Sequence, residues 1–241
     1  MRNGCRIGVV IPALDEEQAI ARVVGEIPDW ADEIVVADNG SRDGTARAAK
    51  EAGARVVREE ERGYGAACQA GIRALEAADI VVFLDGDYSD HPEEMAAIVD
   101  PIATGQVDLV IGSRVRGKAA RGSLTLQQRF GNWLACLLIG RLWGIIYSDL
   151  GPFRAIRRDV LERLNMTDRN YGWTVEMQIK VATFGLKYLE VPVSYRPRIG
   201  ASKVSGTLRG TLMAGFKILT LIGSAAVRSR TWDAGARKWP T

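Results

Sequence analysis

The sequence predicts an α/β fold in which helices flank a mainly parallel sheet. Two observations carry this prediction. Short apolar runs alternate with amphipathic segments along the first half of the chain, and polar residues follow directly after several of those runs. Such alternation is typical of βαβ units with right-handed crossovers. The length of 241 residues, with 47% hydrophobic and 25% charged residues, suits one globular domain with a substantial core.

The first half supplies five expected strands and four helices. The run Ile80–Leu84 is continuously apolar, which indicates a strand buried on both faces. The other strands are expected at Arg6–Ile11, Glu33–Ala37, Arg55–Arg58 and Leu109–Gly112, with helices at Glu16–Glu26, Gly44–Glu51, Gly65–Ala77 and Pro92–Ile102. Ligands of such sheets bind beyond the carboxyl ends of the strands, which places the candidate site at that edge.

The pattern changes after Gly112. Helices are expected at Gln127–Tyr147 and Thr174–Phe184, and strand-like runs at Lys187–Val191 and Val193–Tyr195. Gln127–Tyr147 and Thr207–Val227 are long apolar segments interrupted by basic residues. Neither offers the ~18 uninterrupted apolar residues of a membrane-spanning helix. Both could lie in a membrane interface or serve as core or dimer helices, and these alternatives stay open.

Charge and cysteine content exclude some classes of protein. The net charge of +3 and a pI near 8.8 permit an anionic ligand or a membrane surface, and they do not call for nucleic acid. Cys5, Cys68 and Cys136 are odd in number and contain no C-x-x-C pair, so neither a disulfide framework nor a zinc site is expected. This cysteine pattern fits a reducing compartment best. No signal peptide is expected, because the amino terminus runs straight into a strand.

Two carboxylates one residue apart follow the buried strand, in Asp85-Gly86-Asp87. Residues i and i+2 of an extended chain point the same way, so Asp85 and Asp87 can converge on one cation. Gly86 leaves room for a ligand to approach the backbone. Hard oxygen ligands at this place suit Mg²⁺ or Mn²⁺ holding a diphosphate. The alternative is an Asp-Gly turn with solvated carboxylates.

Other nucleotide-binding motifs are missing or incomplete. The first strand is followed by Pro12-Ala13-Leu14-Asp15-Glu16-Glu17 and not by the glycines of a dinucleotide-binding fingerprint. Gly63-Tyr64-Gly65 lacks the third glycine at the required spacing. No Walker A loop, G-x-S-x-G elbow or H-E-x-x-H motif occurs.

In order, the motifs resemble those of the family 2 glycosyltransferases, especially the branch of dolichol- and polyprenyl-phosphate sugar transferases. The resemblance extends to about Leu221 and rests on Val10–Glu16, Val36–Thr45, Arg62–Ala67, Asp85–Pro92, Asp149–Arg154 and Arg198–Lys203. It implies a GT-A fold, a nucleotide-sugar donor, inversion at the sugar carbon, and Mg²⁺ or Mn²⁺ as cofactor. It also implies that Asp87 is the main metal ligand, with Asp85 bound directly or through water.

The resemblance assigns donor binding to the strand ends. Pro12, Ala13 and Gly86 would contact the donor, Glu16 would accept hydrogen bonds from ribose hydroxyls, and Asp38 from a nucleobase N–H. Gly63 and Gly65 would let backbone N–H groups approach the nucleotide, unless they only form a turn. Asp43 binds the donor or, alternatively, supports a helix start.

The resemblance places phosphate and acceptor contacts in the second half. Arg154, Arg198, Ser202 and Lys203 are the expected anion-binding residues, and Arg196 competes with Arg198 because the spacing departs from the family's usual form. Glu176 aligns with a general base of relatives that use hydroxyl acceptors, although it could merely orient a neighbour. Asp149 is a catalytic or a supporting carboxylate.

The sequence thus predicts an inverting hexosyltransferase with a polyprenyl-phosphate acceptor, placed in the cytoplasm and peripheral at the inner membrane face. The first alternative is a soluble or glycolipid hydroxyl acceptor with Glu176 as base; remoter ones are a nucleotidyltransferase and a non-catalytic sugar-nucleotide sensor. The expected domain spans 1–206, with a nucleotide-sugar half at 1–112, an acceptor half at 113–206, and an amphipathic helix and basic tail at 207–241. Oligomeric state and the choice between UDP and GDP stay open.

Overall fold

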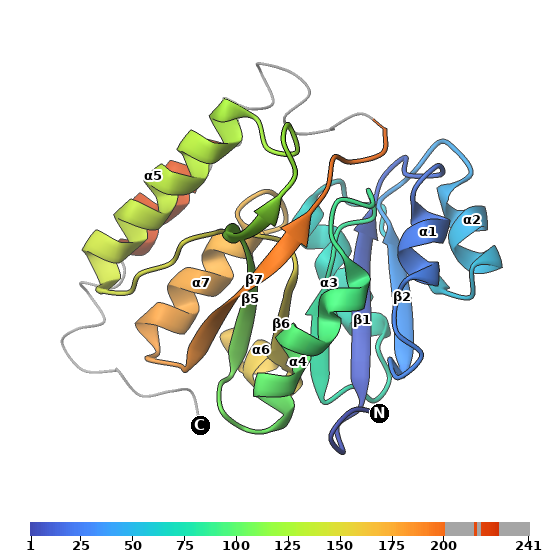
Figure 1. Ribbon diagram of the computed structural model, residues 1–241, viewed down its shortest axis with the longest axis horizontal. Coiled ribbons are helices and arrows are strands. Elements are labelled where there is room, and N and C mark those ends of the chain that lie inside the picture. Colours follow the sequence, from blue (N-terminus) through green and yellow to red (C-terminus); the bar gives the residue numbers. More distant parts are fainter. Residues whose placement is uncertain (201–214, 216–217, 227–241) are drawn as a thin grey trace.

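The computed structural model describes residues 1–200, 215 and 218–226. Its centre is a seven-stranded sheet in the order β3-β2-β1-β4-β6-β5-β7, with helices on both faces (Figure 1). The strands are β1 (Ile7–Ala13), β2 (Glu33–Asp38), β3 (Arg55–Arg58), β4 (Ile80–Phe83), β5 (Leu109–Ala119), β6 (Arg154–Arg157) and β7 (Tyr188–Tyr195). All neighbouring strands pair parallel except at β6, which is antiparallel to both β4 and β5. The predicted mainly parallel α/β fold is confirmed.

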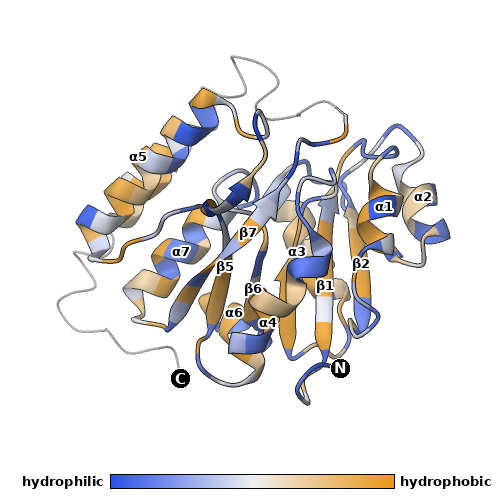
Figure 2. Cartoon of the chain, in the orientation of Figure 1, coloured by the Kyte–Doolittle hydropathy of each residue, from blue (hydrophilic) through white to orange (hydrophobic). Residues whose placement is uncertain are grey.

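The strands divide their side chains between two cores. Val9 and Ile11 of β1 pack in one cluster, whereas Val10 packs in the other, because successive side chains of a strand point to opposite faces. The helices are α1 (Ile20–Gly25), α2 (Thr45–Glu51), α3 (Tyr64–Ala74), α4 (Met95–Ala103), α5 (Leu126–Trp143), α6 (Arg158–Leu164) and α7 (Trp173–Thr183). Residues of α1, α2 and α4 join the first cluster, and residues of α3, α5, α6 and α7 join the second. Figure 2 shows the hydrophobic colouring along the central strands.

Helix α6 was not expected, and three strands differ from the sequence prediction. β6 was not expected, because it is four residues long and has Arg154 and Arg157 at its ends. β5 continues to Ala119 and passes through the expected boundary between the two halves. β7 is one strand and not two, because Pro192 lies in an edge strand, where the missing N–H leaves fewer ladder bonds broken.

The loop after β1 is longer than expected and is fastened to the loop after β2. α1 begins at Ile20 and not at Glu16, which leaves residues 14–19 at the carboxyl edge of the sheet. The Asp15 N–H donates to Ser41 Oγ at 2.9 Å, and the Arg42 N–H donates to Asp15 Oδ1 at 2.8 Å. These bonds fix the two loops that carry the first two polar motifs.

The second half ends in helices over one side of the sheet. α5 begins with a capping box between Thr125 and Gln128 and ends at Gly144, whose φ of 72° is a left-handed cap. Residues 218–226 are helical, and Ile222 is buried in the same core cluster as α5 and α7.

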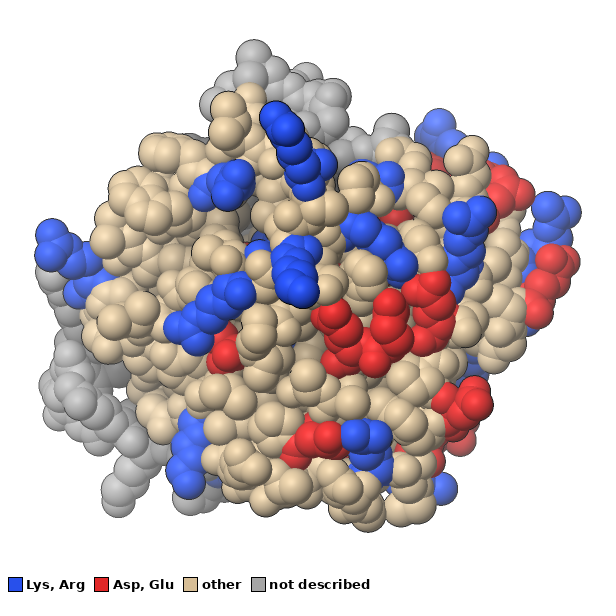
Figure 3. All heavy atoms as spheres, viewed as in Figure 1, with Lys and Arg blue, Asp and Glu red and all other residues tan. Residues whose placement is uncertain are grey.

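Lys and Arg side chains lie on the surface over α5 and the end of β5 (Figure 3). Within the described part of the chain, no helix is both long and apolar enough to cross a membrane. Most of the expected segment Thr207–Val227 lies outside the described residues.

Candidate active site

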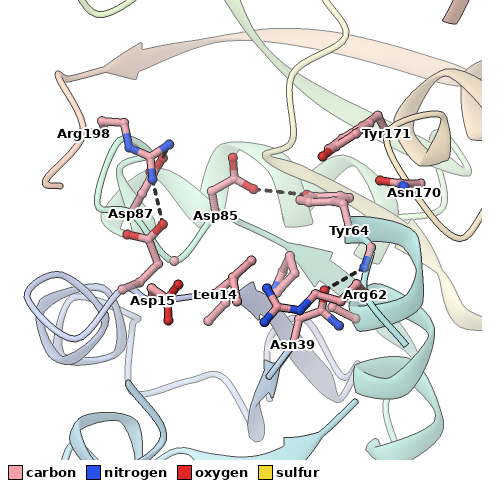
Figure 4. A pocket seen from close by; sticks show the side chains of 16 residues that line it. Leu14, Asp15, Asn39, Arg62, Tyr64, Asp85, Asp87, Asn170, Tyr171 and Arg198 are labelled. Carbon is pink, nitrogen blue, oxygen red and sulfur yellow. Dashed lines mark hydrogen bonds and ion pairs between the residues drawn. The ribbon is translucent and has the colours of Figure 1, made fainter. Parts of the chain in front are cut away.

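The carboxyl ends of β1, β2 and β4 meet at one edge of the sheet. Ala13 lies opposite Asp38 in the β1–β2 pair, and Val10 lies opposite Phe83 in the β1–β4 pair. A cavity of about 460 Å³ opens at this edge (Figure 4); we call it the donor cavity. Its lining consists of Pro12, Ala13, Leu14, Asp15, Glu16, Asn39, Arg62, Gly63, Tyr64, Ala67, Asp85, Gly86, Asp87, Asn170, Tyr171 and Arg198. The structure therefore brings together most of the residues that the sequence assigned to donor and metal binding.

Asp85 and Asp87 lie in the wall of this cavity with different partners. Asp87 Oδ1 accepts from the Ser89 N–H at 2.9 Å and from Ser89 Oγ at 2.5 Å, which fixes its carboxylate. Asp87 Oδ2 is 3.2 Å from Arg198 Nη1. Asp85 Oδ1 accepts from the Tyr64 hydroxyl at 3.1 Å (Figure 4). The hydrogen bonds leave both side chains facing the same space.

Negative charge accumulates around Asp85. Burial and then the neighbouring charges of Asp87 and Asp90 raise the pKa of Asp85 well above its usual value. Asp90 is buried, and its Oδ2 accepts from the Asp85 N–H at 3.1 Å. Carboxylates crowded in this way are stabilised by a cation, and oxygen donors are the ligands of Mg²⁺ and Mn²⁺. The residues present therefore fit a divalent metal.

The protein itself offers few ligands for that metal. Among the described residues, no group of three or more His, Cys, Asp or Glu side chains is arranged to hold a metal ion. Mg²⁺ commonly uses one or two carboxylates and completes its shell with phosphate oxygens and water. Asp85 and Asp87 would therefore hold a metal together with a bound diphosphate and not as a closed protein cage.

Gly63 and Gly65 serve a packing purpose that the sequence did not reveal. A Cβ at Gly65 would lie 2.1 Å from the Asp168 carbonyl oxygen, and one at Gly63 would lie 2.0 Å from that of Arg169. Gly65 is also absent from the cavity lining. The two glycines thus let the start of α3 approach the backbone of residues 168–169. This approach brings the neighbouring Asn170 and Tyr171 into the donor cavity, where the sequence had not predicted them.

Asp38 and Asp43 bind the loop that follows β2. Asp38 Oδ1 accepts from the Ser41 N–H at 3.0 Å, and Asp38 is not among the lining residues. Asp43 Oδ1 accepts from the Thr45 N–H at 3.0 Å, just before α2. Although burial opposes it, hydrogen bonds from Thr45 and Glu17 lower the pKa of Asp43. The structure thus places Asp43 at the start of the helix, the alternative role that the sequence left open.

Asn39 is a lining residue that the sequence analysis missed. Its Nδ2 donates to the carbonyl oxygens of Glu59 at 3.2 Å and Glu61 at 2.7 Å, and its Oδ1 accepts from the Gly63 N–H at 2.7 Å. These bonds connect the loop after β2 to the glycine-containing turn before α3. Its place next to Asp38 at a strand end was the signal that could have identified it.

Arg198 and Arg196 follow β7 and have separate environments. Arg198 lines the donor cavity, with Nη2 2.6 Å from Glu16 Oε1 and Nη1 near Asp87. Arg196 instead pairs with Glu26 at 2.7 Å and stacks on the Tyr88 ring at 3.3 Å. The structure therefore brings Arg198, and not Arg196, to the cavity. Ser202 and Lys203 lie outside the described residues.

A second cavity of about 950 Å³ lies between α5, the end of β5 and residues 144–149; we call it the arginine cavity. Four arginines line it, together with apolar side chains that include Trp133, Leu137 and Ile146; the arginines are Arg114, Arg121, Arg129 and Arg141. The donor cavity, by contrast, is rich in carboxylates. The two cavities differ in the sign of the charge they would attract.

Asp149 lies in the wall of the arginine cavity and is tied to Arg114. Asp149 Oδ1 is 2.7 Å from Arg114 Nη2, and Asp149 Oδ2 is 2.9 Å from Arg114 Nε. Although burial opposes it, this carboxylate raises the pKa of Arg114. Asp149 is fully buried, so its geometry supports the position of Arg114. Burial raises the pKa of Asp85 and Asp90, and the positive charge of Arg114 only partly offsets this.

Glu176 and Arg154 line neither cavity. Glu176 Oε2 accepts from the Asp168 N–H at 2.7 Å, Oε1 accepts from Thr167 Oγ1 at 2.7 Å, and Lys180 Nζ is 2.8 Å away. Arg154 is fully buried and donates to the carbonyl oxygens of Leu150, Gly151 and Thr174. Burial lowers the pKa of Arg154 to about 10. Both side chains satisfy buried backbone groups, so the structure does not bring the expected base or this expected phosphate ligand to the site.

Comparison with known proteins decides the family. Residues 8–164 match the model of the family described as glycosyl transferase family 2, and this match covers more than half of the chain. The chain belongs to glycosyltransferase family 2. It is 34% identical over 204 residues to the dolichyl-phosphate hexose transferase of Haloferax volcanii. This alignment covers 82% of this chain and 86% of that protein. It is 29% identical over 247 residues to the undecaprenyl-phosphate mannosyltransferase of Micrococcus luteus, with 96% of each chain covered. These relatives support the predicted polyprenyl-phosphate sugar transferase branch.

A solved structure supports the GT-A fold of this glycosyltransferase. Glucosyl-3-phosphoglycerate synthase from Mycobacterium tuberculosis, in complex with Mn²⁺, UDP-glucose and phosphoglyceric acid, superposes with a TM-score of 0.71 and 28% identity. The superposition covers 93% of this chain and 80% of the synthase. The predicted GT-A fold is confirmed, and a divalent metal with a UDP-sugar occurs in this structural neighbour.

Proposed function

We propose that this glycosyltransferase moves a hexose from a UDP- or GDP-linked sugar to a polyprenyl phosphate at the cytoplasmic face of a membrane, with inversion at the sugar carbon. The observation that carries the proposal is the pair of cavities with opposite charge. A metal-bound diphosphate suits the carboxylates of the donor cavity, and an acceptor that combines phosphate with hydrocarbon suits the arginine cavity.

The donor would occupy the cavity at the strand ends. Asp87 and Asp85 would hold Mg²⁺ or Mn²⁺ against the diphosphate, and the metal would neutralise the charge that builds on the departing nucleoside diphosphate. Pro12, Ala13, Gly63 and Gly86 line the same space. Glu16 would accept hydrogen bonds from ribose hydroxyls. Arg198, which pairs with Glu16 and Asp87, would donate to the phosphate oxygens of the donor.

The acceptor phosphate would bind to the arginines of the second cavity. Arg129 and Arg141 form no ion pair with any side chain in the described ranges, so their charges are available to an anion. Trp133, Leu137 and Ile146 would contact the first isoprene units. Asp149 would act by holding the guanidinium of Arg114 between the two cavities.

The chemistry requires no general base from the protein. An oxygen of the acceptor phosphate attacks the anomeric carbon while the bond from that carbon to the diphosphate oxygen breaks, and the nucleoside diphosphate leaves with the electron pair. The acceptor phosphate is already an anion, so no proton has to be removed. This agrees with the position of Glu176, whose oxygens are engaged by Thr167, Asp168 and Lys180.

A phosphorylated hydroxyl acceptor is the second candidate. The observation in its favour is the likeness to a synthase whose complex contains phosphoglyceric acid. Its chemistry would need a base near the donor sugar, and Glu176 lines neither cavity. The apolar lining of the arginine cavity therefore favours the lipid phosphate.

Turnover with the full chain tests the proposal. The purified protein is incubated with Mn²⁺ and each of a set of UDP- and GDP-hexoses, and with either a short-chain prenyl phosphate or 3-phosphoglycerate. We expect mass spectrometry to detect a prenyl-phosphate hexose with one donor, and EDTA to stop its formation. A sugar transferred only to 3-phosphoglycerate would replace the lipid acceptor by the second candidate. Activity that is unchanged in EDTA would refute the metal.

A further inference from the structure

The outer face of α5 carries a row of exposed apolar side chains. Leu126, Phe130, Trp133 and Leu137 are spaced by four, three and four residues, which places them on one face of a helix. Their exposed fractions are 80%, 61%, 57% and 44%. The rings of Phe130 and Trp133 are 5.7 Å apart, so the aromatic part of the row is continuous. We call these four residues the α5 stripe.

Packing within the chain accounts for a different face of this helix. Ala135, Cys136 and Ile139 are buried and join the core cluster that contains α7. α5 therefore has two apolar faces, of which the core uses one. Soluble proteins rarely expose a contiguous row of large apolar side chains unless the row binds something. The α5 stripe therefore indicates a docking surface.

The charge around the stripe identifies the kind of partner. From Leu109 to Ser148 the sequence contains no Asp or Glu, and its charged residues are Arg114, Arg116, Lys118, Arg121, Arg129 and Arg141. Arg129 and Arg141 stand on α5 itself, and both are exposed. Basic side chains stand around this surface in Figure 3. An exposed row of Leu, Phe and Trp with arginines beside it is the composition of a helix that lies in the interface of an anionic membrane.

We propose that the α5 stripe docks this protein on an anionic lipid bilayer, with α5 lying in the plane of the interface. Trp133 and Leu137 belong to the stripe and also line the arginine cavity. Docking would therefore bring the cavity to the level of the lipid headgroups. This orientation adds a membrane-bound position to the proposed function, and it rests on that function only for the identity of the acceptor. The attachment itself depends only on the stripe and its charges.

Vesicle sedimentation tests the surface with a matched pair of variants. Leu126 and Phe130 line neither cavity, so the double variant L126S/F130S changes the stripe and leaves the binding residues in place. L189S removes an exposed leucine of the edge strand β7 and serves as the control. We expect the wild type and L189S to sediment with vesicles of phosphatidylcholine and phosphatidylglycerol at 3:1, and less at high salt. L126S/F130S should partition at least about tenfold less, a loss of about 1.4 kcal/mol.

Two outcomes of the sedimentation would overturn the proposal. One is that the wild type stays in the supernatant with the anionic vesicles, and the other is that L126S/F130S binds as well as the wild type. Light scattering on the same samples tests a second copy of the chain as the occupant. A dimer that L126S/F130S converts to monomer, with no vesicle binding, would assign the stripe to self-association.

A fluorescence measurement keeps the test valid if L126S/F130S does not fold, which thermal unfolding would reveal. F130W retains an aromatic residue and adds a tryptophan to the stripe, and L189W adds one to the control position. We expect brominated phospholipids in anionic vesicles to quench the added fluorescence of F130W and not that of L189W. Equal quenching of the two, or none in F130W, would overturn the proposal.

Turnover in solution separates this inference from the proposed function. With a short-chain prenyl phosphate and no vesicles, L126S/F130S should retain the wild-type rate. With a long-chain polyprenyl phosphate in vesicles, its rate should fall in proportion to the lost binding. If no prenyl phosphate is ever glycosylated but the stripe still governs vesicle binding, the proposed acceptor fails and the docking surface stands.

Discussion

The two cavities of this glycosyltransferase use charge in opposite ways. The donor cavity has Asp85 and Asp87 in its wall, and burial, together with the neighbouring carboxylates, raises the pKa of Asp85. One arginine, Arg198, pairs with this acidic wall. The arginine cavity has one carboxylate, Asp149, which is paired with Arg114, while Arg129 and Arg141 have no carboxylate partner within the described ranges. The first arrangement favours a cation and the second an anion.

This difference distinguishes two roles of charged side chains. Where charge of one sign is in excess, as around Asp85 or Arg129, a ligand of the opposite charge can balance it. Side chains whose hydrogen-bonding groups are already engaged inside the fold, such as Arg154 with backbone carbonyl oxygens and Glu176 with Lys180, stabilise the scaffold and are less available to a ligand. The excess charge, and not the presence of a charged motif, therefore marks the candidate site.

Removal of Asp87 should have the largest effect, because it tests directly whether the donor cavity depends on its carboxylates. D87A removes the expected metal ligand, and a metal supplies several kcal/mol of transition-state stabilisation. We expect kcat to fall about 1,000-fold, measured as nucleoside diphosphate released at saturating donor. D100A, which removes a surface carboxylate paired with Arg2, should leave kcat unchanged. If D87A keeps full activity, the donor cavity does not depend on its carboxylates.

Arginine substitutions should then separate the two cavities. R129A removes a charge from the arginine cavity, and a charge-assisted hydrogen bond contributes about 1.5–3 kcal/mol. The KM for prenyl phosphate should therefore rise roughly 10- to 150-fold, while the KM for the donor stays constant. R198A should raise the KM for the donor instead. If both variants change the same KM, the cavities do not divide the substrates as we propose.

The residues of the donor cavity could be predicted from the sequence better than those of the acceptor half. Asp85, Asp87 and Glu16 each follow an apolar run that is recognisable as a strand, and the edge of a parallel sheet gathers such residues automatically. The missed strand β6 begins with Arg154, and a four-residue run with charged ends carries little strand signal. The fold could thus be predicted where its elements alternate regularly.

Residues whose role depends on a distant partner could not be assigned from the sequence. Arg154 looks like an anion ligand until the carbonyl oxygens of Gly151 and Thr174 are seen around it. Gly65 looks like part of a nucleotide loop until the Asp168 backbone is seen against it. In both cases the residue type alone suggests ligand binding, and the contact that decides its role comes from another part of the chain.

Gly65 offers a smaller and sharper test of how the donor cavity is built. In G65A the new Cβ would meet the Asp168 carbonyl oxygen, so the start of α3 or the 168–171 segment has to move. Overpacking of this kind costs about 1–3 kcal/mol, measurable by denaturant unfolding, and displacement of Asn170 and Tyr171 should raise the KM for the donor. In G131A, by contrast, the Cβ meets nothing within 4 Å on α5, and stability should rise by about 0.5–1 kcal/mol. A G65A protein as stable as wild type would show that this contact is not needed.

Glu176 should give the smallest change in turnover, and it decides between the two acceptor chemistries. Although burial opposes it, hydrogen bonds from Lys180, Asp168 and Thr167 lower the pKa of Glu176. A lowered carboxyl pKa contributes stability above the unfolded-state value of about 4.3, and that stability is lost as the pH falls through the folded-state pKa. E176Q should therefore be about 1–3 kcal/mol less stable at pH 7, and the difference from wild type should shrink below about pH 4. Denaturant unfolding across pH measures this, and kcat with prenyl phosphate should stay within a few fold of wild type. Loss of turnover without loss of stability would mean that Glu176 removes a proton. A hydroxyl acceptor would then replace the lipid phosphate, and the arginine cavity would need another ligand.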